Sequence, residues 1–233
     1  MQRGSGQWQP HHPNGKRTDL RIGTWNLEGK WSASHLALVT DLVCDVWLLT
    51  EVRRDANVAG WHSHLTSADM QPGRAWAGVL SREPLTPAAD PHPASAVASV
   101  AGITYCASIL PWKGSGDRKP WIGRDHAERT GNALADLRAA LSPGVVWGGD
   151  FNHAMEGREY AGGLAGRAQI RRLLDDLGLT LPTRRLPHRN ADLLTIDHIA
   201  VPDGTEVAGV EHHDATGLSD HDAYVVTVGI SAR

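Results

Sequence analysis

A chain of 233 residues is long enough to bury a substantial hydrophobic core, as one fairly large domain or two small ones. Its 41% apolar and 21% charged residues are typical of a soluble globular protein. The net charge of −3 argues against a strongly basic surface that clamps many phosphates of a duplex, although a local basic groove stays compatible with it.

The N-terminus has no apolar segment of the kind that directs secretion, and no apolar run approaches the length needed to cross a membrane. These features predict a cytoplasmic protein with no membrane association. The two cysteines, Cys44 and Cys106, are far apart and stand in apolar surroundings, which favours buried free thiols over a disulfide. Nothing in the sequence indicates an oligomeric state.

In chain order, residues 1–18 are rich in glycine, proline and histidine without any period, and we expect a flexible leader. A single α/β domain is predicted over residues 19–233, with a hairpin turn at residues 101–102. Residues 53–73 are predicted to be a loop or a short helix, and residues 111–124 a long loop. Apolar spacing predicts strands at residues 20–26, 45–50, 75–80, 95–100, 103–110, 145–150, 194–201 and 222–230, a helix capped by Ser32, and helices at 125–141 and 164–177.

The most informative stretch of the sequence is Gly148-Gly149-Asp150-Phe151-Asn152, which follows a buried apolar run. On an extended segment the side chains of Asp150 and Asn152 would point to the same side. A carboxylate beside an amide can hold a metal, orient a water or bind a phosphate. The alternative is a strand that ends in an Asx-type turn, because glycine, aspartate and asparagine are common turn residues.

Polar residues of the same kind recur at the ends of other predicted strands. In mixed α/β folds, ligand sites form where such strand ends converge. Repetition at five successive places favours a shared site over five unrelated turns. The residues are Asn26 and Glu28, Glu51, Asp150 and Asn152, Asp197 with His198, and Ser219-Asp220-His221.

These short motifs resemble, in their order, those of the endonuclease/exonuclease/phosphatase superfamily, which includes abasic-site endonucleases, DNase I-type nucleases and inositol-phosphate 5-phosphatases. The resemblance spans residues 20 to about 228 and implies a four-layer α/β sandwich, in which two packed mixed β-sheets are flanked by helices. The matching segments are Thr24-Trp25-Asn26, Leu48-Leu49-Thr50-Glu51-Val52, Gly149-Asp150-Phe151-Asn152, Ile196-Asp197-His198-Ile199 and Ser219-Asp220-His221.

The resemblance also implies catalytic roles. Asp150 matches the residue that orients or deprotonates the attacking water, and Asn152 the residue that holds a phosphoryl oxygen. His221 matches the imidazole at the phosphate, acting as a base or as an electrostatic stabiliser, and Asp197 would accept its other ring N–H. The sequence leaves open whether Asp150 or His221 takes the proton.

For the metal site, the resemblance implies Glu51 as the principal carboxylate ligand, with Asn26 and Asp220 lining the same position. Hard oxygen ligands suit Mg²⁺ or Mn²⁺. Glu28 is a further candidate, because some family members have an acidic second ligand there, but it is equally compatible with an exposed residue before a helix.

One position departs from the family pattern. Many members end the strand that matches residues 104–110 with a His or Tyr that contacts the phosphate or protonates the leaving group, whereas this chain has Ser108 there. A serine hydroxyl donates a hydrogen bond but does not titrate near neutrality. Ser108, through that hydrogen bond, and Arg124, His126 and His153 are the candidates to contact the substrate phosphate. The alternatives are a leaving group that departs with the help of the metal alone and, for the loop residues, a solvated loop.

Two classes of substrate fit these residues. A nuclease is favoured by the clustered basic residues Arg171, Arg172, Arg184, Arg185, His188 and Arg189 and by the exposed-looking tryptophans Trp61, Trp112 and Trp121, which would stack on bases. A phosphatase or phosphodiesterase acting on a small or lipid phosphate is favoured by the compact length and mildly acidic charge. A binding module without turnover is the third possibility, kept open by the missing His or Tyr.

Overall fold

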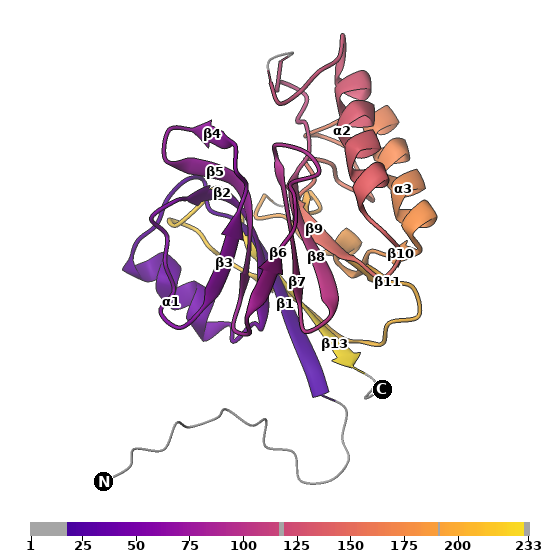
Figure 1. The fold of residues 1–233 in the computed structure, drawn as a ribbon. Helices are drawn as coiled ribbons and strands as arrows, with labels where there is room; N and C mark the ends of the chain where they lie inside the picture. The colour runs from indigo at the N-terminus through magenta and orange to yellow at the C-terminus, as the bar shows by residue number, and fades with distance from the viewer. Residues whose placement is uncertain (1–17, 117–118, 191, 231–233) are drawn as a thin grey trace, which may run out of the picture.

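The computed structural model describes residues 18–116, 119–190 and 192–230, whose strands form two mixed β-sheets (Figure 1). The strand order of the first sheet is β12 (Val207–His213), β13 (Ala223–Ile230), β1 (Thr18–Asn26), β2 (Val46–Arg53), β5 (Arg74–Ser81) and β3 (His62–Leu65), with β4 (Asp69–Gln71) also paired to β5. The order of the second sheet is β10 (Leu179–Thr180), β11 (Asp197–Pro202), β9 (Val146–Asp150), β8 (Ile103–Ile109), β7 (Ser95–Val100) and β6 (Leu85–Pro87).

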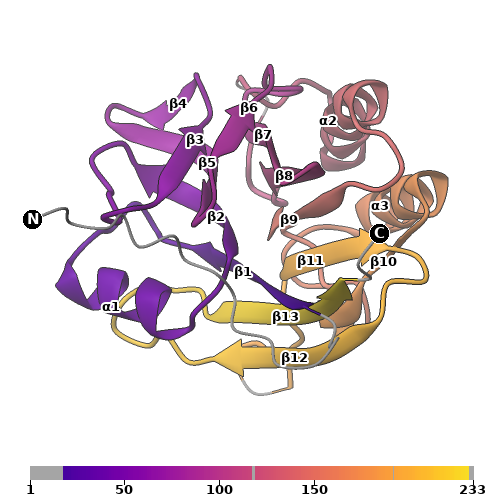
Figure 2. The same cartoon turned by 60° about the horizontal axis from the view of Figure 1, so that its bottom comes forward.

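Helices cover the outer face of each sheet (Figure 2). Helix α1 (Ala33–Asp41) packs on the first sheet, while α2 (His126–Ala140) and α3 (Leu164–Leu177) pack side by side on the second. A short 3-10 helix, Pro182–Arg185, precedes β11. The arrangement confirms the predicted four-layer α/β sandwich. No helix in the described part of the chain is both long and apolar enough to span a membrane.

Each central strand buries both of its faces, which explains its continuous apolar run. In β2, Leu48 packs between the two sheets, whereas the neighbouring Trp47 packs under α1. In β9, Val146 faces the other sheet and Trp147 faces α2 and α3. Alternate residues of a central strand therefore pack in different apolar layers. One layer lies between the sheets, and the others lie between each sheet and its helices.

Local sequence signals fix several element ends. The Asp125 carboxylate accepts a hydrogen bond from the Glu128 backbone N–H and caps α2. Gly178 ends α3 in the left-handed conformation. Ser32 precedes α1 as predicted, but the expected side-chain cap is wrong. Its hydroxyl bonds no backbone N–H of the helix and instead contacts Nδ1 of His35 at 2.8 Å.

Other predicted boundaries are corrected. Residues 53–73 contain the short strands β3 and β4 instead of only loop or helix, and β6, β10 and β12 were not predicted. The strand expected at residues 194–201 begins at Asp197, and Thr18 already belongs to β1, while residues 1–17 of the expected leader lie outside the described residues. Cys44 and Cys106 are buried free thiols, as predicted.

Gly149 is required by the close approach of two neighbouring strands just before Asp150. Its φ angle is +125°, and a Cβ atom built there would lie 2.2 Å from the backbone oxygen of Ser108 on β8. A side chain at this position therefore cannot fit without moving β8 or β9 apart. The backbone conformation at Gly149 therefore determines where the next residue, Asp150, lies at the sheet edge.

We predict that Gly149→Ala destabilises the protein more than Gly204→Ala does. Both glycines have a positive φ angle, but a Cβ atom at Gly204 would meet no atom within 4 Å. Both variants carry the left-handed backbone penalty, and overpacking adds about 1–3 kcal/mol at residue 149 alone. Urea denaturation measures the difference in unfolding free energy, and equal losses in the two variants would contradict the proposed clash.

His198 is a fully buried imidazole behind the sheet edge. Its Nδ1 and Nε2 atoms contact the Thr183 hydroxyl at 3.2 Å and the His153 carbonyl at 3.0 Å. Burial lowers the pKa of His198 to about 3, so the ring stays neutral in the folded protein across the physiological range. In the unfolded chain the same group titrates near its ordinary pKa of 6.5.

We therefore predict that His198 makes stability fall as pH decreases from about 6.5 toward 3. In this window the unfolded chain binds a proton at residue 198 and the folded chain does not. One such proton contributes a slope approaching about 1.4 kcal/mol per pH unit. Urea denaturation between pH 7.5 and 4.5 should give a shallower slope for His198→Gln than for the wild type. Parallel slopes would show that His198 is not held neutral.

Candidate active site

The polar residues predicted from the strand ends meet at one edge of the sandwich. β1 and β2 are parallel with Asn26 opposite Thr50, so Asn26 at the end of β1 lies beside Glu51, the residue after Thr50 in β2. β9 and β11 are antiparallel with Asp150 opposite Asp197, so the end of one strand meets the start of the next. Asp197 therefore reaches the edge at the beginning of β11, and not at a strand end as the sequence suggested.

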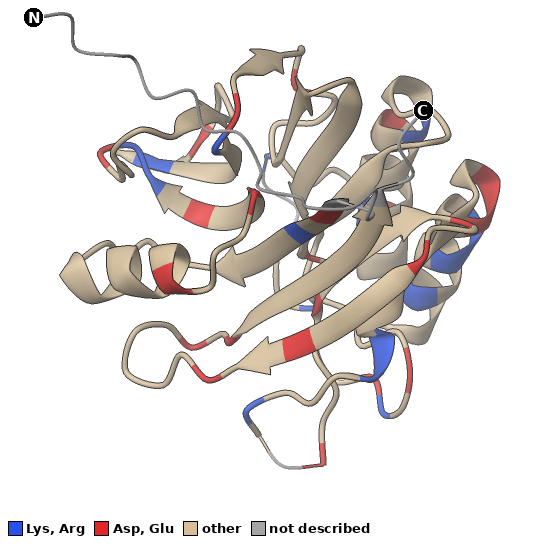
Figure 3. Ribbon diagram, turned by 90° about the horizontal axis from the view of Figure 1, so that it is seen from below, with Lys and Arg blue, Asp and Glu red and all other residues tan. Residues whose placement is uncertain are grey.

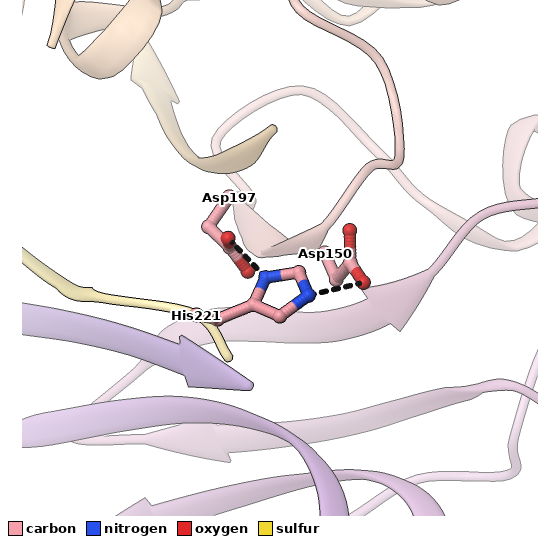
Figure 4. Close-up of side chains that lie close together, drawn as sticks. All are labelled: Asp150, Asp197 and His221. Carbon is pink, nitrogen blue, oxygen red and sulfur yellow. Dashed lines mark hydrogen bonds and ion pairs between the residues drawn. The ribbon is translucent and has the colours of Figure 1, made fainter. Parts of the chain in front are cut away.

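An acid–imidazole–acid row occupies the centre of this edge (Figure 4). Nδ1 of His221 lies 2.7 Å from Oδ2 of Asp197, and Nε2 on the other side of the ring lies 4.0 Å from Oδ2 of Asp150. A third carboxylate, that of Asp220, lies 3.9 Å from the same Nε2. Asp150 and Asp197 are almost fully buried, so their charges act on the imidazole with little screening by water.

These neighbours set the protonation of the row. Burial lowers the pKa of His221, but the charges of Asp197, Asp150 and Asp220 and the hydrogen bond to Asp197 more than offset it and raise the pKa to about 10. Burial raises the pKa of Asp150 to about 7, opposed by the His221 charge and reinforced by Asp197. The ring is therefore a charged donor at neutral pH, held in one orientation by Asp197.

A carboxylate pair adjoins the row and provides a position for a cation. Oε1 of Glu51 and Oδ2 of Asp150 converge on one atom, the side-chain nitrogen of Asn26, at 3.2 and 3.1 Å. These two acids come from different sheets, and their oxygens suit Mg²⁺ or Mn²⁺. Asn26 presents its nitrogen to them while its oxygen accepts the Glu28 N–H at 2.9 Å, so ligation by Asn26 requires the amide to rotate.

Asp150, Asp197 and His221 also lie close enough together to hold a metal ion, with potential ligand atoms within 4.8 Å of one another. The geometry of these three residues nevertheless favours the Glu51–Asp150 pair as the position for the cation. Nδ1 of His221 is already paired with Asp197, and the fixed imidazole leaves Nε2 as its free face. The donor set of hard oxygens at Glu51 and Asp150 fits a divalent cation better than this hydrogen-bonded row.

The remaining metal candidates lie at the rim of the site. Oε2 of Glu28 accepts hydrogen bonds from the Asp220 backbone N–H at 3.0 Å and from Lys30 at 2.7 Å. The Asp220 side chain is 67% exposed and open to a ligand. The structure thus brings Glu28 and Asp220 together beside the carboxylate pair, and their roles as metal ligands stay predictions.

Asn152 reaches the site by a turn and not by an extended segment. Its φ angle is 51°, and its backbone N–H donates to Oδ1 of Asp150 at 2.9 Å, which is an Asx turn. Its side-chain nitrogen donates to the Leu110 carbonyl at 3.0 Å. The expectation that the two side chains share one face of a strand is therefore wrong, yet the turn places both residues at the same edge.

The structure contradicts the proposed substrate role of Ser108. Its hydroxyl is fully buried on the helix side of β8, where it accepts a hydrogen bond from the Trp147 indole at 3.0 Å. His153 is likewise fully buried, and its Nδ1 contacts the Phe151 carbonyl at 2.7 Å. Neither side chain can reach a substrate without local unfolding.

The other two phosphate candidates are not brought to the row. His126 packs against the His153 ring, and its Nε2 contacts the Pro111 carbonyl at 2.9 Å. Arg124 has a side chain that is 92% exposed and pairs with Glu128 at 2.9 Å. His126 is the first residue of α2 and Arg124 lies two residues before it. No contact in the described part of the chain links either residue to Asp150 or His221.

Two arginines that support the site could not be identified as such from the sequence. Arg74 on β5 pairs with Glu51 at 2.8 Å, a contact created by the pairing of β2 with β5. Arg189 donates to the Ser219 carbonyl at 2.6 Å and to the buried Asp222 carboxylate at 2.5 Å. Arg189 therefore holds the segment that carries Asp220 and His221. From the sequence alone, Arg189 was assigned to a basic cluster for nucleic-acid binding.

The expected basic and aromatic surface is largely engaged within the protein. Arg184 and Arg185 both pair with Glu156, and Arg171 donates to the Met155 carbonyl. Trp121 is only 2% exposed, so it is not available for stacking on bases. Trp61 and Trp112 are half-buried. Seen from below, from the edge opposite the site, acidic and basic residues are interspersed (Figure 3).

The sequence profile of the Endonuclease/Exonuclease/phosphatase family matches residues 23–221. No curated protein matches the chain in sequence.

Several solved structures share the fold at low sequence identity. The endonuclease domain of TRAS1, a telomere-specific non-LTR retrotransposon, has a TM-score of 0.66 at 16% identity, covering 91% of this chain and 98% of that one. AP endonuclease LMAP from Leishmania major has a TM-score of 0.67 at 15% identity, covering 92% and 89%. The catalytic domain of APE2 from Xenopus laevis has a TM-score of 0.65 at 13% identity, covering 92% and 94%. The profile match and the shared sandwich together show that this chain belongs to the endonuclease/exonuclease/phosphatase family.

Proposed function

We propose that this protein is a divalent-metal-dependent phosphodiesterase and that its substrate is nucleic acid. The observation that carries the proposal is the row Asp197–His221–Asp150, which shares Asp150 with the Glu51–Asp150 carboxylate pair. A charged donor, a water-orienting acid and a cation position are the groups that hydrolysis of a phosphodiester needs. The arrangement supports all of them within one sheet edge.

In the proposed reaction Asp150 orients and deprotonates the attacking water. Its carboxylate is held by the Asn152 N–H and the Asn26 amide, between the imidazole and Glu51. His221 is an unsuitable base while Asp197 occupies Nδ1 and carboxylates surround the ring; instead, its Nε2–H donates to a phosphoryl oxygen. Asn152 is proposed to hold a second phosphoryl oxygen.

The cation would be held by Glu51 and Asp150, with Asp220 and the rotated Asn26 amide as further ligands. When bound there, Mg²⁺ or Mn²⁺ would neutralise the negative charge that develops on the phosphate and on the leaving oxygen. This contribution matters more in this chain because Ser108 stands where many relatives have a His or Tyr, and its hydroxyl is bound to Trp147. Arg74 keeps the other Glu51 oxygen in place.

Nucleic acid is the favoured substrate class because the structures named above that share this sandwich include a retrotransposon endonuclease domain and an AP endonuclease. The mild negative charge of the chain then predicts recognition through a limited number of phosphate contacts. A phosphatase on a small or lipid phosphate and a binding module without turnover are the alternatives that the following experiment separates.

We predict Mg²⁺- or Mn²⁺-dependent cleavage of single- or double-stranded DNA or RNA, abolished by EDTA. Asp150→Asn and His221→Ala should each lower the rate by about 10²–10⁴-fold, because each removes a group that acts in the transition state. His213→Ala is the matched control, since His213 on β12 pairs with Glu211 away from the site.

Cleavage at the wild-type rate in both Asp150→Asn and His221→Ala would contradict the mechanism. Release of phosphate from small monoesters, without any cleavage of oligonucleotides, would replace the nuclease by a phosphatase. Absence of turnover on every phosphoester, with retained binding of metal, would make the protein a binding module.

A further inference from the structure

A pocket of about 590 Å³ opens between β4, β5 and α2. It lies beside the candidate active site, because β5 carries both the pocket residue Trp76 and Arg74, which pairs with Glu51. Behind it, Ile109 packs against Trp76 and is aligned with Asp150 on the neighbouring strand. Its lining includes Trp76, His92, Pro93, Ile122, Arg129 and Asp136.

Arg129 is a buried cation in this pocket and has no acidic partner among the described residues. It is 8% exposed, its Nε has no hydrogen-bond partner, and its one hydrogen bond among the described residues is a 3.5 Å contact from Nη1 to the Gly123 carbonyl. Arg167 is equally buried but pairs with Glu159 at 3.3 Å and also donates to the Gly157 carbonyl. A guanidinium removed from water without an anion is unfavourable, so the pocket of Arg129 is suited to receive one.

The acidic residues that line the pocket do not pair with Arg129. Asp69 pairs with Arg54 at 2.6 Å on the β4 side. Asp136, two helical turns along α2 from Arg129, forms no ion pair with it among the described residues, although its charge raises the pKa of His92 against the larger lowering effect of burial. An external anion is therefore the partner that the guanidinium lacks, and planar guanidinium matches phosphate oxygens in two parallel hydrogen bonds.

The walls of the pocket indicate what the anion is attached to. Trp76 and Pro93 provide apolar surface, and Ile122, which is 62% exposed, adds an accessible aliphatic side chain to the lining. The His92 ring lies stacked on Trp121 with centroids 5.2 Å apart, which makes that wall flat and rigid. A flat ring joined to a phosphate meets both the apolar surface and the guanidinium, and a nucleotide has this composition.

We propose that this pocket is a nucleotide subsite, in which Arg129 binds a phosphate and the wall formed by Trp76, Pro93 and Ile122 receives the attached base. In the substrate the bound unit is a nucleotide that neighbours the scissile phosphate, and this placement rests on the proposed nuclease function. Binding of a nucleotide by the pocket itself needs neither metal nor catalysis.

The test measures binding of adenosine 5′-monophosphate, adenosine and inorganic phosphate by calorimetry in EDTA, so that no turnover occurs. The wild type should bind the nucleotide more tightly than either of its parts. Arg129→Gln should weaken nucleotide binding by at least about tenfold, because it removes charge-assisted hydrogen bonds. Arg138→Gln is the matched control on the same helix, since Arg138 is half exposed and pairs with Asp176.

Two further variants keep the test decisive. Ile122→Asp changes an exposed residue, so the variant should fold, and the added charge at the opening should repel the nucleotide even if Arg129→Gln is unstable. His221→Ala should retain binding, which separates the pocket from the catalytic row. The proposal is overturned if no nucleotide binds, if Arg129→Gln and Ile122→Asp bind as the wild type does, or if binding is lost in His221→Ala instead. Because these measurements need no hydrolysis, they give an answer whether or not the protein cleaves nucleic acid.

Discussion

The hydrogen bond between His221 and Asp197 joins the two β-sheets at the edge where the functional residues meet. Asp197 begins β11 of the second sheet, and His221 lies two residues before β13 of the first. The bond from Asn26 to Asp150 crosses the same boundary, whereas the bond from Asn26 to Glu51 stays within the first sheet. Because each sheet contributes only part of the row and of the carboxylate pair, the site exists only while the sheets keep their relative position.

The packing between the sheets maintains that position. Gly148 lets Leu48 of the first sheet approach closely, since a Cβ atom there would lie 2.7 Å from the Leu48 side chain. Immediately beyond it, Gly149 directs the chain so that Asp150 reaches the edge. The glycines that the sequence marks as a turn signal thus serve sheet contact and strand direction at successive positions. Burial also raises the pKa of Asp150, whereas the pKa of His221 is raised by the neighbouring carboxylates against the effect of burial.

The sequence predicts those parts of the structure that depend on local patterns. Apolar spacing located the central strands and helices α2 and α3, and the order of short motifs indicated the family and its sandwich. Short edge strands such as β3 and β12 were missed because their residues are only partly buried and lack a clear apolar period. Their existence depends on pairing with β5 and β13 more than on their own composition.

Within the site, sequence reasoning identified side chains but not their partners. Asp150, Asp197 and His221 were found because they lie in motifs, whereas Arg74 and Arg189 act through contacts set by strand register and loop path. Ser108 was misassigned because a strand position does not reveal which face meets the Trp147 indole. Arg129 was not identified for a similar reason, since only the fold shows that it is buried and that no acidic residue in the described part of the chain pairs with it.

The central claim is that Asp197 acts through His221, and a double-mutant cycle on metal-dependent cleavage tests it most directly. The cycle compares the wild type, Asp197→Asn, His221→Ala and the double variant. Asp197→Asn should slow the wild-type enzyme markedly but change the rate of the His221→Ala variant by no more than about twofold, because its partner is already absent. Multiplication of the two single effects in the double variant would contradict the account.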